Sequence, residues 1–318
     1  METRPLGDTG LEVTSLGLGL AALGRPGYLN LGHGTDLAGR RDVEALEHHT
    51  HAMLDAAWQS GIRYFDAARS YGRAEAFLAS WLNTRAIDSN AVTVGSKWGY
   101  RYTAGWRVDA ENHEIKDLSH GHLQSQYSES IDLLGPHLKL YQIHSATRAV
   151  LEDPAVLERL ARIRDRGVVI GLSVSGPQQV ENIRDAIEVT ADGVRLFGAV
   201  QATWNLLEPS AGPALREAHE AGLGVIVKEA LANGRLTARD DTAVRALVRW
   251  LPGVAPDAAA LAAALDQPWA DVVLSGAATL DQLASNVDAL DVAHPGELPS
   301  MAEDPEIYWS NRSSLTWT

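Results

Sequence analysis

The strongest pattern along the chain is an alternation of short apolar runs with longer segments whose apolar residues recur every three or four positions. Short runs rich in β-branched residues predict strands, and the longer spacing predicts amphipathic helices. A β-hairpin is expected first, over residues 4–13, with Asp8, Thr9 and Gly10 in its turn. Eight strands are then expected at residues 15–19, 63–66, 92–97, 140–144, 168–173, 199–201, 224–228 and 271–275.

Helical spacing occupies the segments between these strands. The first helix, over residues 43–57, is closed by Gly61. Further helices are expected over 73–82, over 118–134, from Pro154, from Pro177, and over 213–221, 243–250 and 280–290. Alternation of this kind is typical of a parallel sheet with crossover helices. Eight repeats without a linker favour one α/β domain over residues 1–318, a (β/α)8 TIM barrel with an N-terminal β-hairpin.

A doubly wound sheet is the alternative fold. It would place a glycine-rich turn between an early strand and its helix. Residues 16–24 are rich in glycine, but their glycines lack the G-x-G-x-x-G spacing and the next helix starts nearly twenty residues later. The barrel is therefore the preferred prediction.

Composition narrows the class of protein. The 318 residues are 45% hydrophobic and 21% charged, which supports a buried core and excludes wholesale disorder. The apolar stretch 254–265 contains Pro256 and Asp257 and predicts a capped surface helix. The first ten residues hold no signal-peptide-like run, and no window approaches the ~20 apolar residues of a membrane span. We therefore expect a soluble, cytoplasmic protein with no membrane partner.

Charge and the lack of cysteine exclude further classes. Forty-one acidic and 27 basic residues give a net charge of -14, which would repel nucleic acid. Without cysteine, the chain has no disulfide, thiolate metal site or cysteine nucleophile. His48, His49 and His51 are expected on a helix that faces away from the strand ends, so no metal site is predicted.

Four polar residues follow or end neighbouring predicted strands. Asp66 ends the second strand, Tyr71 lies in the loop after it, Lys97 ends the third and His144 ends the fourth. Singly, they have ordinary explanations: a helix cap, a rim aromatic, a solvated strand end and a core histidine. Together they would meet at the carboxyl end of the barrel, where the active sites of this fold lie.

Together these four side chains could act as a general acid and the groups that support it. A phenol has a reference pKa of about 10, so Tyr71 is a weak acid unless a cation such as Lys97 stabilises its phenolate. Asp66 would keep Lys97 charged, and the ring N–H of His144 could bind a carbonyl oxygen. No metal-ligand cluster is evident, so a hydride-donating cofactor is the natural complement.

In these residues and in an ordered set of motifs the chain resembles the aldo-keto reductases, a (β/α)8-barrel family of nicotinamide-dependent carbonyl reductases. The family's Asp-Tyr-Lys-His tetrad falls on Asp66, Tyr71, Lys97 and His144. The matching stretches run nearly end to end and are residues 4–11, 16–19, 65–72, 94–97, 141–144, 171–173, 200–205 and 275–286. Singly each is a weak signal, but the ordered set is specific.

The resemblance also implies where a cofactor binds. Ser173 and Gln201 would hold the nicotinamide carboxamide, and backbone N–H groups of residues 276–279 would face phosphate at a helix start. Gln282 and Asn286 would meet the adenosine, and the loop 231–237 would cover the pyrophosphate. The full expected set is Gly19, Leu20, Ser173, Gln201, Trp204, Lys228, Leu231, Gly234, Ser275, Gly276, Ala277, Thr279, Gln282 and Asn286.

Several positions depart from the family pattern. Val174 stands where asparagine often follows the serine. Lys228 and Glu229 replace an aromatic residue that stacks on the nicotinamide and the serine after it, and Lys228 either binds phosphate or pairs with Glu229. Trp204 either supplies the missing aromatic surface or is an exposed rim residue. Alanines 277 and 278 lie where a basic residue commonly selects the 2′-phosphate, so NADP is expected with NAD as the alternative.

The long segment 98–117, for which no helix or strand is predicted, carries clustered aromatic residues. Loops of this length are often functional. Trp98, Tyr100 and Trp106 are therefore expected to form a stacking wall for a ring-bearing substrate or for the cofactor, or else to pack the loop on the barrel. The C-terminal tail, with Tyr308, Trp309, Leu315 and Trp317, is expected to fold back over the barrel and reach the pocket rim.

The expected activity is NADP-dependent reduction of an aldehyde or ketone to an alcohol, with Tyr71 as general acid. The same groups run in reverse would oxidise a sugar hydroxyl or lactol. A catalytically weak nucleotide-binding regulatory barrel is an alternative of another class. Schiff-base chemistry at Lys97 or Lys228 is disfavoured at Lys97 because Asp66 keeps that amine charged. The expected partner is a small carbonyl or sugar-like molecule, and no oligomeric state is predicted.

Overall fold

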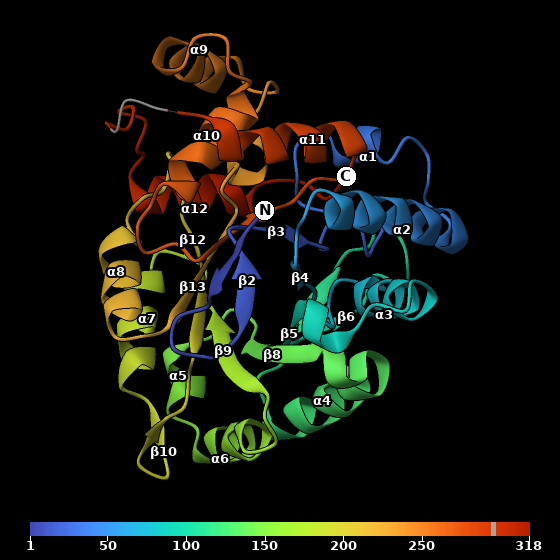
Figure 1. Ribbon diagram of the computed structural model, residues 1–318, viewed down its shortest axis with the longest axis vertical. Helices are drawn as coiled ribbons and strands as arrows, with labels where there is room; N and C mark the ends of the chain where they lie inside the picture. Colours follow the sequence, from blue (N-terminus) through green and yellow to red (C-terminus); the bar gives the residue numbers. More distant parts are fainter. Residues whose placement is uncertain (294–296) are drawn as a thin grey trace.

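The computed structural model describes residues 1–293 and 297–318, in which eight parallel strands close into a barrel surrounded by helices (Figure 1). Its last strand pairs with its first, in parallel, which closes the ring. The predicted (β/α)8 barrel is confirmed. In order around the ring the strands are β3 (Leu16–Gly19), β4 (Tyr64–Asp66), β5 (Thr93–Trp98), β8 (Leu138–Ile143), β9 (Val169–Ser173), β12 (Ala199–Thr203), β13 (Gly224–Lys228) and β14 (Val272–Ser275).

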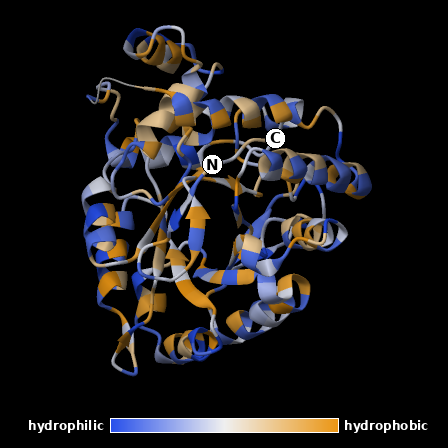
Figure 2. Cartoon of the chain, in the orientation of Figure 1, coloured by the Kyte–Doolittle hydropathy of each residue, from blue (hydrophilic) through white to orange (hydrophobic). Residues whose placement is uncertain are grey.

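The barrel strands are buried on both faces. Every residue of β4, β5 and β12 is buried. Parallel strands enclosed in this way have near-continuous apolar sequences. Figure 2 shows this as largely orange strands inside a ring of helices that mix orange and blue. The short apolar runs therefore located the barrel strands correctly.

The helices surround the barrel. Asp42 caps the first long one, accepting a hydrogen bond from Ala45 N at 2.8 Å. The α-helices are α1 (His33–Asp36), α2 (Val43–Gln59), α3 (Ala74–Thr84), α4 (His120–Leu134), α5 (Arg148–Leu151), α6 (Pro154–Arg164), α7 (Gln179–Glu188), α8 (Gly212–Glu220), α9 (Asp241–Trp250), α10 (Pro256–Leu265), α11 (Leu280–Asp288) and α12 (Pro305–Ser313). Shorter elements are η1 (Ser89–Ala91), η2 (Gly135–His137), η3 (Ala232–Gly234), η4 (Ala289–Asp291) and the strand pair β10 (Thr190–Ala191) and β11 (Val194–Arg195). None of these helices is long and apolar enough to cross a membrane.

The predicted N-terminal hairpin is present as β1 (Thr3–Pro5) and β2 (Glu12–Thr14). Leu6 and Val13 pack in one cluster with buried barrel residues, among them Ala199 at the start of β12. Gly7 has φ +49°, and a Cβ there would lie 2.4 Å from Gly224 N, so this close approach requires glycine. The hairpin thus covers the amino ends of the strands and leaves the carboxyl ends for a ligand.

Two sequence predictions are wrong. The stretch predicted as a surface helix forms α10, in which residues 258–264 are all buried. Its alanines are small enough for close packing, and residues of α9 and α12 join three of them in a second apolar cluster. The segment 98–117 is not an unstructured loop, because β6 (Tyr100–Tyr102) and β7 (Glu114–Lys116) form an antiparallel hairpin in it.

The C-terminal tail returns to the carboxyl end of the barrel, as expected. Tyr28 and Thr318 exchange two backbone hydrogen bonds, each of 3.2 Å. Tyr28 lies in the loop after β3, so the tail is attached beside the first strand of the ring. This attachment brings Trp317 to the rim of the cavity described next.

Candidate active site

A cavity of about 750 Å³ opens at the carboxyl end of the barrel. Gly19, Asp66, Lys228 and Ser275, each the last residue of its strand, line it. Loops after the strands and the C-terminal segment complete the walls. The cavity therefore lies where (β/α)8 enzymes carry their active sites.

Lys97 and Asp66 form a buried ion pair beside this cavity. Lys97 Nζ donates to Asp66 Oδ1 and, at 3.0 Å, to Ala67 O. The two side chains are 0% and 2% exposed. Asp66 Oδ2 accepts from Gln201 Nε2 at 3.0 Å and from Tyr64 OH at 3.1 Å. Both carboxylate oxygens thus have donors, and the predicted contact between Lys97 and Asp66 is present.

Tyr71 completes this group and faces the cavity. Lys97 Nζ lies 5.1 Å from the centroid of its ring, and the ring of His144 lies 5.5 Å away, centroid to centroid. Burial, and then the charge of Asp66, raises the pKa of Tyr71 well above its usual value, while Arg25 acts in the opposite direction. The pKa of Tyr71 is therefore raised, whereas Lys97 was expected to lower it, because the effect of burial is larger than that of the nearby cations. Tyr71 is therefore a protonated phenol that can donate.

His144 lies next to Tyr71 at the end of the fourth barrel strand. Its Nδ1 is 3.4 Å from Ser70 Oγ, and the ring of Tyr100 lies 4.9 Å away, centroid to centroid. Burial, followed by the charges of Lys97 and Lys228, holds the pKa of His144 well below 6.5. The imidazole is therefore neutral, so one ring nitrogen carries a proton and the other accepts.

A buried arginine that sequence reasoning missed stands against Tyr71. The guanidinium carbon of Arg25 lies 5.2 Å from the centroid of Tyr71 and 4.6 Å from that of Trp317. Arg25 Nη1 donates to Ser70 O at 3.1 Å and to Glu114 Oε2 at 3.0 Å. In the sequence, the one feature that could have indicated Arg25 is its position as a single charged residue directly after the apolar, glycine-rich run 16–24. Arg25 places a second cation near the phenol.

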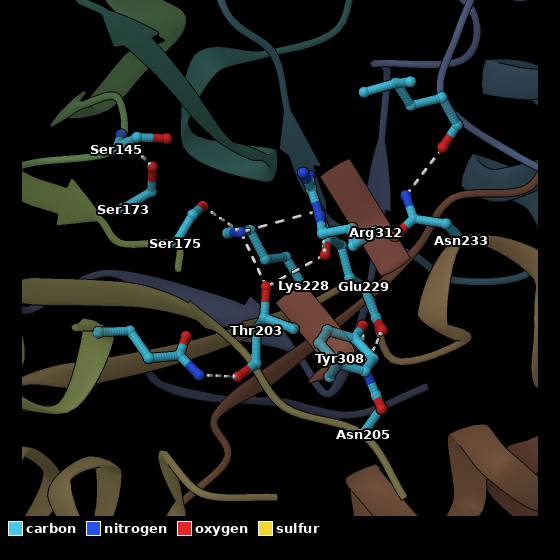
Figure 3. Close-up of polar contacts among 12 residues, drawn as sticks. Ser145, Ser173, Ser175, Thr203, Asn205, Lys228, Glu229, Asn233, Tyr308 and Arg312 are labelled. Atoms are coloured by element: carbon cyan, nitrogen blue, oxygen red, sulfur yellow. Dashed lines mark hydrogen bonds and ion pairs between the residues drawn. The ribbon is translucent and has the colours of Figure 1, made fainter. Parts of the chain in front are cut away.

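Opposite charges also meet at the end of β13, in the cluster drawn in Figure 3. Lys228 Nζ donates to Ser175 Oγ and Thr203 Oγ1, both at 2.9 Å. Glu229 is held by Arg312 of α12, whose Nε lies 2.9 Å from Oε2 and 3.1 Å from Oε1. Lys228 Nζ lies 3.9 Å from Glu229 Oε1, so the pairing predicted for these two is present but is the longer contact.

Many of the expected cofactor residues line the cavity. Their positions extend from the tetrad along the loop after β13 to the start of α11. Those that line it are Gly19, Gln201, Lys228, Leu231, Gly234, Ser275, Gly276, Ala277, Gln282 and Asn286. A cavity of about 750 Å³, lined by Gln201 from β12 and by Gln282 from α11, has room for a dinucleotide.

Four expected cofactor residues do not line the cavity. Leu20 is in the core, and Ser173 Oγ accepts from Ser145 N at 2.9 Å. Trp204 is buried against Trp269, so it is not an exposed rim residue. Thr279 caps α11 by accepting from Gln282 N at 3.2 Å. Their roles toward a cofactor therefore remain predictions, and any such role would be indirect in this arrangement.

The expected aromatic wall is reduced to one residue. Tyr100 lines the cavity, whereas Trp98 and Trp106 do not. Trp98 is fully buried in β5, and Trp106 Nε1 donates to Arg41 O at 2.7 Å. The expectation that loop aromatics pack on the barrel describes these tryptophans better. The structure instead brings Trp317 to the cavity from the C-terminal tail.

The start of α11 differs in part from the expected phosphate site. Ala278 N donates to Gln282 Oε1 at 2.9 Å, and Ala277 N to Ser275 Oγ at 3.3 Å, so both N–H groups already have acceptors. The Asn286 side-chain amide is oriented so that its oxygen accepts from the Ser275 hydroxyl at 2.8 Å and its nitrogen donates to Asp257 Oδ2 at 3.3 Å. A carboxylate therefore lines the cavity at the end expected to hold adenosine.

Two of the helix histidines contact backbone carbonyls. His49 Nε2 lies 2.7 Å from Ala278 O, in the turn whose neighbouring residues Gly276 and Ala277 line the cavity, so His49 is less remote than predicted. His51 Nε2 lies 3.2 Å from Phe77 O of α3. Among residues 1–293 and 297–318, no three histidine or acidic side chains are grouped as metal ligands.

Comparison with known proteins gives consistent matches. The model of the Aldo/keto reductase family matches residues 30–297. The chain is 31% identical over 216 residues to a pyridoxal 4-dehydrogenase of Microbacterium luteolum, covering 59% of this chain and 58% of that protein. It is 26% identical over 225 residues to a D-threo-aldose 1-dehydrogenase of a Pseudomonas species, covering 65% and 67%. An aldo-keto reductase from Bacillus halodurans, solved in its holo form, has a TM-score of 0.70 at 21% identity, covering 98% and 96%.

Proposed function

The chain belongs to the aldo/keto reductase family and is an oxidoreductase, and we propose that it reduces an aldehyde or ketone to an alcohol with NADP, using Tyr71 as general acid. The observation that carries the proposal is the convergence of Tyr71, His144 and the Lys97–Asp66 pair at one end of a dinucleotide-sized cavity. When bound there, a nicotinamide cofactor supplies hydride to the carbonyl carbon.

The chain's own residues handle the proton and the oxygen. The neutral imidazole of His144 donates a hydrogen bond to the substrate oxygen. Tyr71 gives its proton to that oxygen as negative charge develops, and its phenolate is then stabilised by Lys97 and Arg25, which lie 5.1 and 5.2 Å from the ring centroid. Asp66 positions Lys97 from the buried side. Trp317 and Tyr28 narrow the rim above Arg25.

The choice between NADP and NAD depends on the adenosine end. The family resemblance favours NADP. Asp257 would repel a 2′-phosphate and would accept a hydrogen bond from a free 2′-hydroxyl, which favours NAD. Gly276 and Ala277 line the cavity there without a basic side chain. Titrating the protein with NADPH and with NADH, followed by tryptophan fluorescence, distinguishes the two.

The reverse reaction, oxidation of a sugar hydroxyl or lactol, is the second candidate. It is favoured by the names of the two relatives, a pyridoxal 4-dehydrogenase and a D-threo-aldose 1-dehydrogenase. The match covers only 58% of the first relative, so its substrate is not transferred as such. Tyr71 would serve as base in this direction once its phenol has lost its proton, because the same proton transfer runs backwards.

Replacing Tyr71 with phenylalanine tests the proposal. We expect turnover of a panel of aldehydes, ketones and sugars to fall by about 10²–10⁴-fold, with cofactor affinity unchanged within a few-fold. Tyr102→Phe is the matched control, since Tyr102 lies on β6 but does not line the cavity, and it should keep full turnover. Undiminished turnover in Tyr71→Phe would contradict the assignment. Tight cofactor binding without turnover in the unaltered protein would favour the regulatory barrel.

A further inference from the structure

Lys228 presents an ammonium group at the cavity wall. It ends β13, and Figure 3 shows it reaching Ser175 and Thr203, which follow or end the two preceding barrel strands. Both partners are neutral hydroxyls. They orient the lysine without removing its charge.

The nearest carboxylate is already neutralised by another residue. Arg312 contacts both oxygens of Glu229, whereas Lys228 Nζ lies 3.9 Å from one of them. The Asp66 carboxylate is likewise taken by Lys97, with which it is buried. Two internally neutral pairs therefore flank Lys228, and its own charge is left facing the cavity.

The groups that surround Lys228 come from several elements. Arg312 of α12 and Lys97 of β5 disfavour its charge, while Glu229 and Asp66 of β4 favour it. Burial, only partly offset by Glu229, lowers the pKa of Lys228 to about 8. The side chain is therefore mainly an ammonium at pH 7 and loses that charge in mildly alkaline solution.

We propose that Lys228 makes the site bind the reduced nicotinamide more tightly than the oxidised one and so favours oxidation of an alcohol or lactol by the bound cofactor. The inference rests on the nicotinamide chemistry of the proposed function and favours its second candidate, the reverse reaction. An oxidised nicotinamide ring carries a positive charge, which Lys228 repels, and a reduced ring is neutral. An aromatic residue at position 228 would do the reverse, since its ring face attracts a cation.

The chemistry balances within this site. In this direction the Tyr71 phenol would first release its own proton to solvent. The substrate carbon would then give a hydride, with its electron pair, to an oxidised nicotinamide, and the substrate hydroxyl would give its proton to the Tyr71 phenolate. The substrate is oxidised to a carbonyl compound or lactone, and the cofactor becomes the neutral form that Lys228 favours. Lys228 is a positioning residue for charge and exchanges no atom with the substrate.

Affinity for the two cofactor forms is the direct test. Dissociation constants of NADP⁺ and NADPH, or of NAD⁺ and NADH if that pair binds better, would be measured at pH 7 by tryptophan fluorescence and by calorimetry. Lys228→Met should lower the ratio of the oxidised to the reduced dissociation constant by about ten-fold, or about 1.4 kcal/mol. Lys228→Arg keeps the charge and should keep a high ratio.

Arg239→Met is the matched control. Arg239 lines the cavity and is bound to Asp36, and it lies two residues beyond the loop 231–237 that is expected to cover the pyrophosphate. Removing this charge should weaken the binding of the oxidised and the reduced cofactor equally and leave the ratio of their dissociation constants unchanged. An equal loss of ratio in Arg239→Met would show a general effect of cavity charge and would overturn the inference.

The unaltered protein provides a second test that needs no variant. Because Lys228 is charged below its pKa and neutral above it, the ratio should be high at pH 6.5 and fall between pH 7.5 and 9 toward the value of Lys228→Met. A ratio that is independent of pH and of Lys228 overturns this inference while the proposed function stands. If neither cofactor form binds the unaltered protein, the proposed function itself fails.

Discussion

Glu229→Gln tests the ion pair that holds the C-terminal helix against the site. Glu229 is 9% exposed, and Arg312 contacts both of its oxygens from α12. Burial alone would raise the pKa of Glu229, but the charges of Arg312 and then Lys228 lower it from 4.5 to about 2. The substitution removes the charge and keeps the length of the side chain.

The expected loss follows from this pKa. A pKa lowered from 4.5 to about 2 corresponds to about 3 kcal/mol of free energy of unfolding at pH 7. The cost of breaking a buried ion pair, about 3–5 kcal/mol, agrees with this value. Because the folded pKa is below the unfolded one, the contribution is complete above about pH 5 and is lost as the pH falls toward 2. At pH 3.5 it should be about 2 kcal/mol.

Urea unfolding of the original protein and the variant, followed by tryptophan fluorescence at pH 7 and pH 3.5, measures this difference. Glu217→Gln is the matched control, because Arg184 holds Glu217 through two contacts of 2.7 and 2.8 Å but on an exposed surface. Its effect should be much smaller. Amide exchange over α12 would show whether the helix detaches first. A Glu229→Gln effect that is no larger than the control's, or that does not shrink in acid, would refute the reasoning.

Two further outcomes are expected. Since burial and the nearby lysines hold the pKa of His144 well below 6.5, its ring signals in an NMR titration should not move between pH 5.5 and 8; a transition near pH 6.5 would contradict a neutral imidazole. Asp257→Asn removes the carboxylate beside Asn286 and should raise affinity for NADPH relative to NADH by about ten-fold; an unchanged ratio, measured by fluorescence titration, would place the 2′-position elsewhere.

The barrel could be predicted because its strands are enclosed. Runs such as residues 168–170 and 225–227 are apolar at successive positions, and helical spacing separates them. The same reasoning wrongly predicted that α10 lies on the surface, since a run of alanines does not show whether further helices, here α9 and α12, will pack over it. It also missed β6 and β7, because a short hairpin over an active site is stabilised by contacts with the barrel rather than by its own sequence.

The tetrad could be located for a related reason. Asp66 and Lys97 lie at strand ends, so the topology alone brings them together. Arg25, Glu114 and Arg312 could not be placed in this way, because they reach the cavity from a loop, from the β6–β7 hairpin and from the C-terminal helix. Their positions depend on tertiary contacts, such as the backbone pairing of Tyr28 with Thr318.

The C-terminal helix links the stability of the fold to the charge of the site. Glu229 has a left-handed backbone, with φ +54°, and its carboxylate meets Arg312. Without that arginine, the nearest cation would be Lys228, and the carboxylate would cancel the charge that faces the cavity. Arg312 therefore does more than attach α12: it occupies Glu229 and leaves Lys228 bound to two neutral hydroxyls. A barrel whose seventh strand ends in adjacent opposite charges can thus still present a net cation to its cavity.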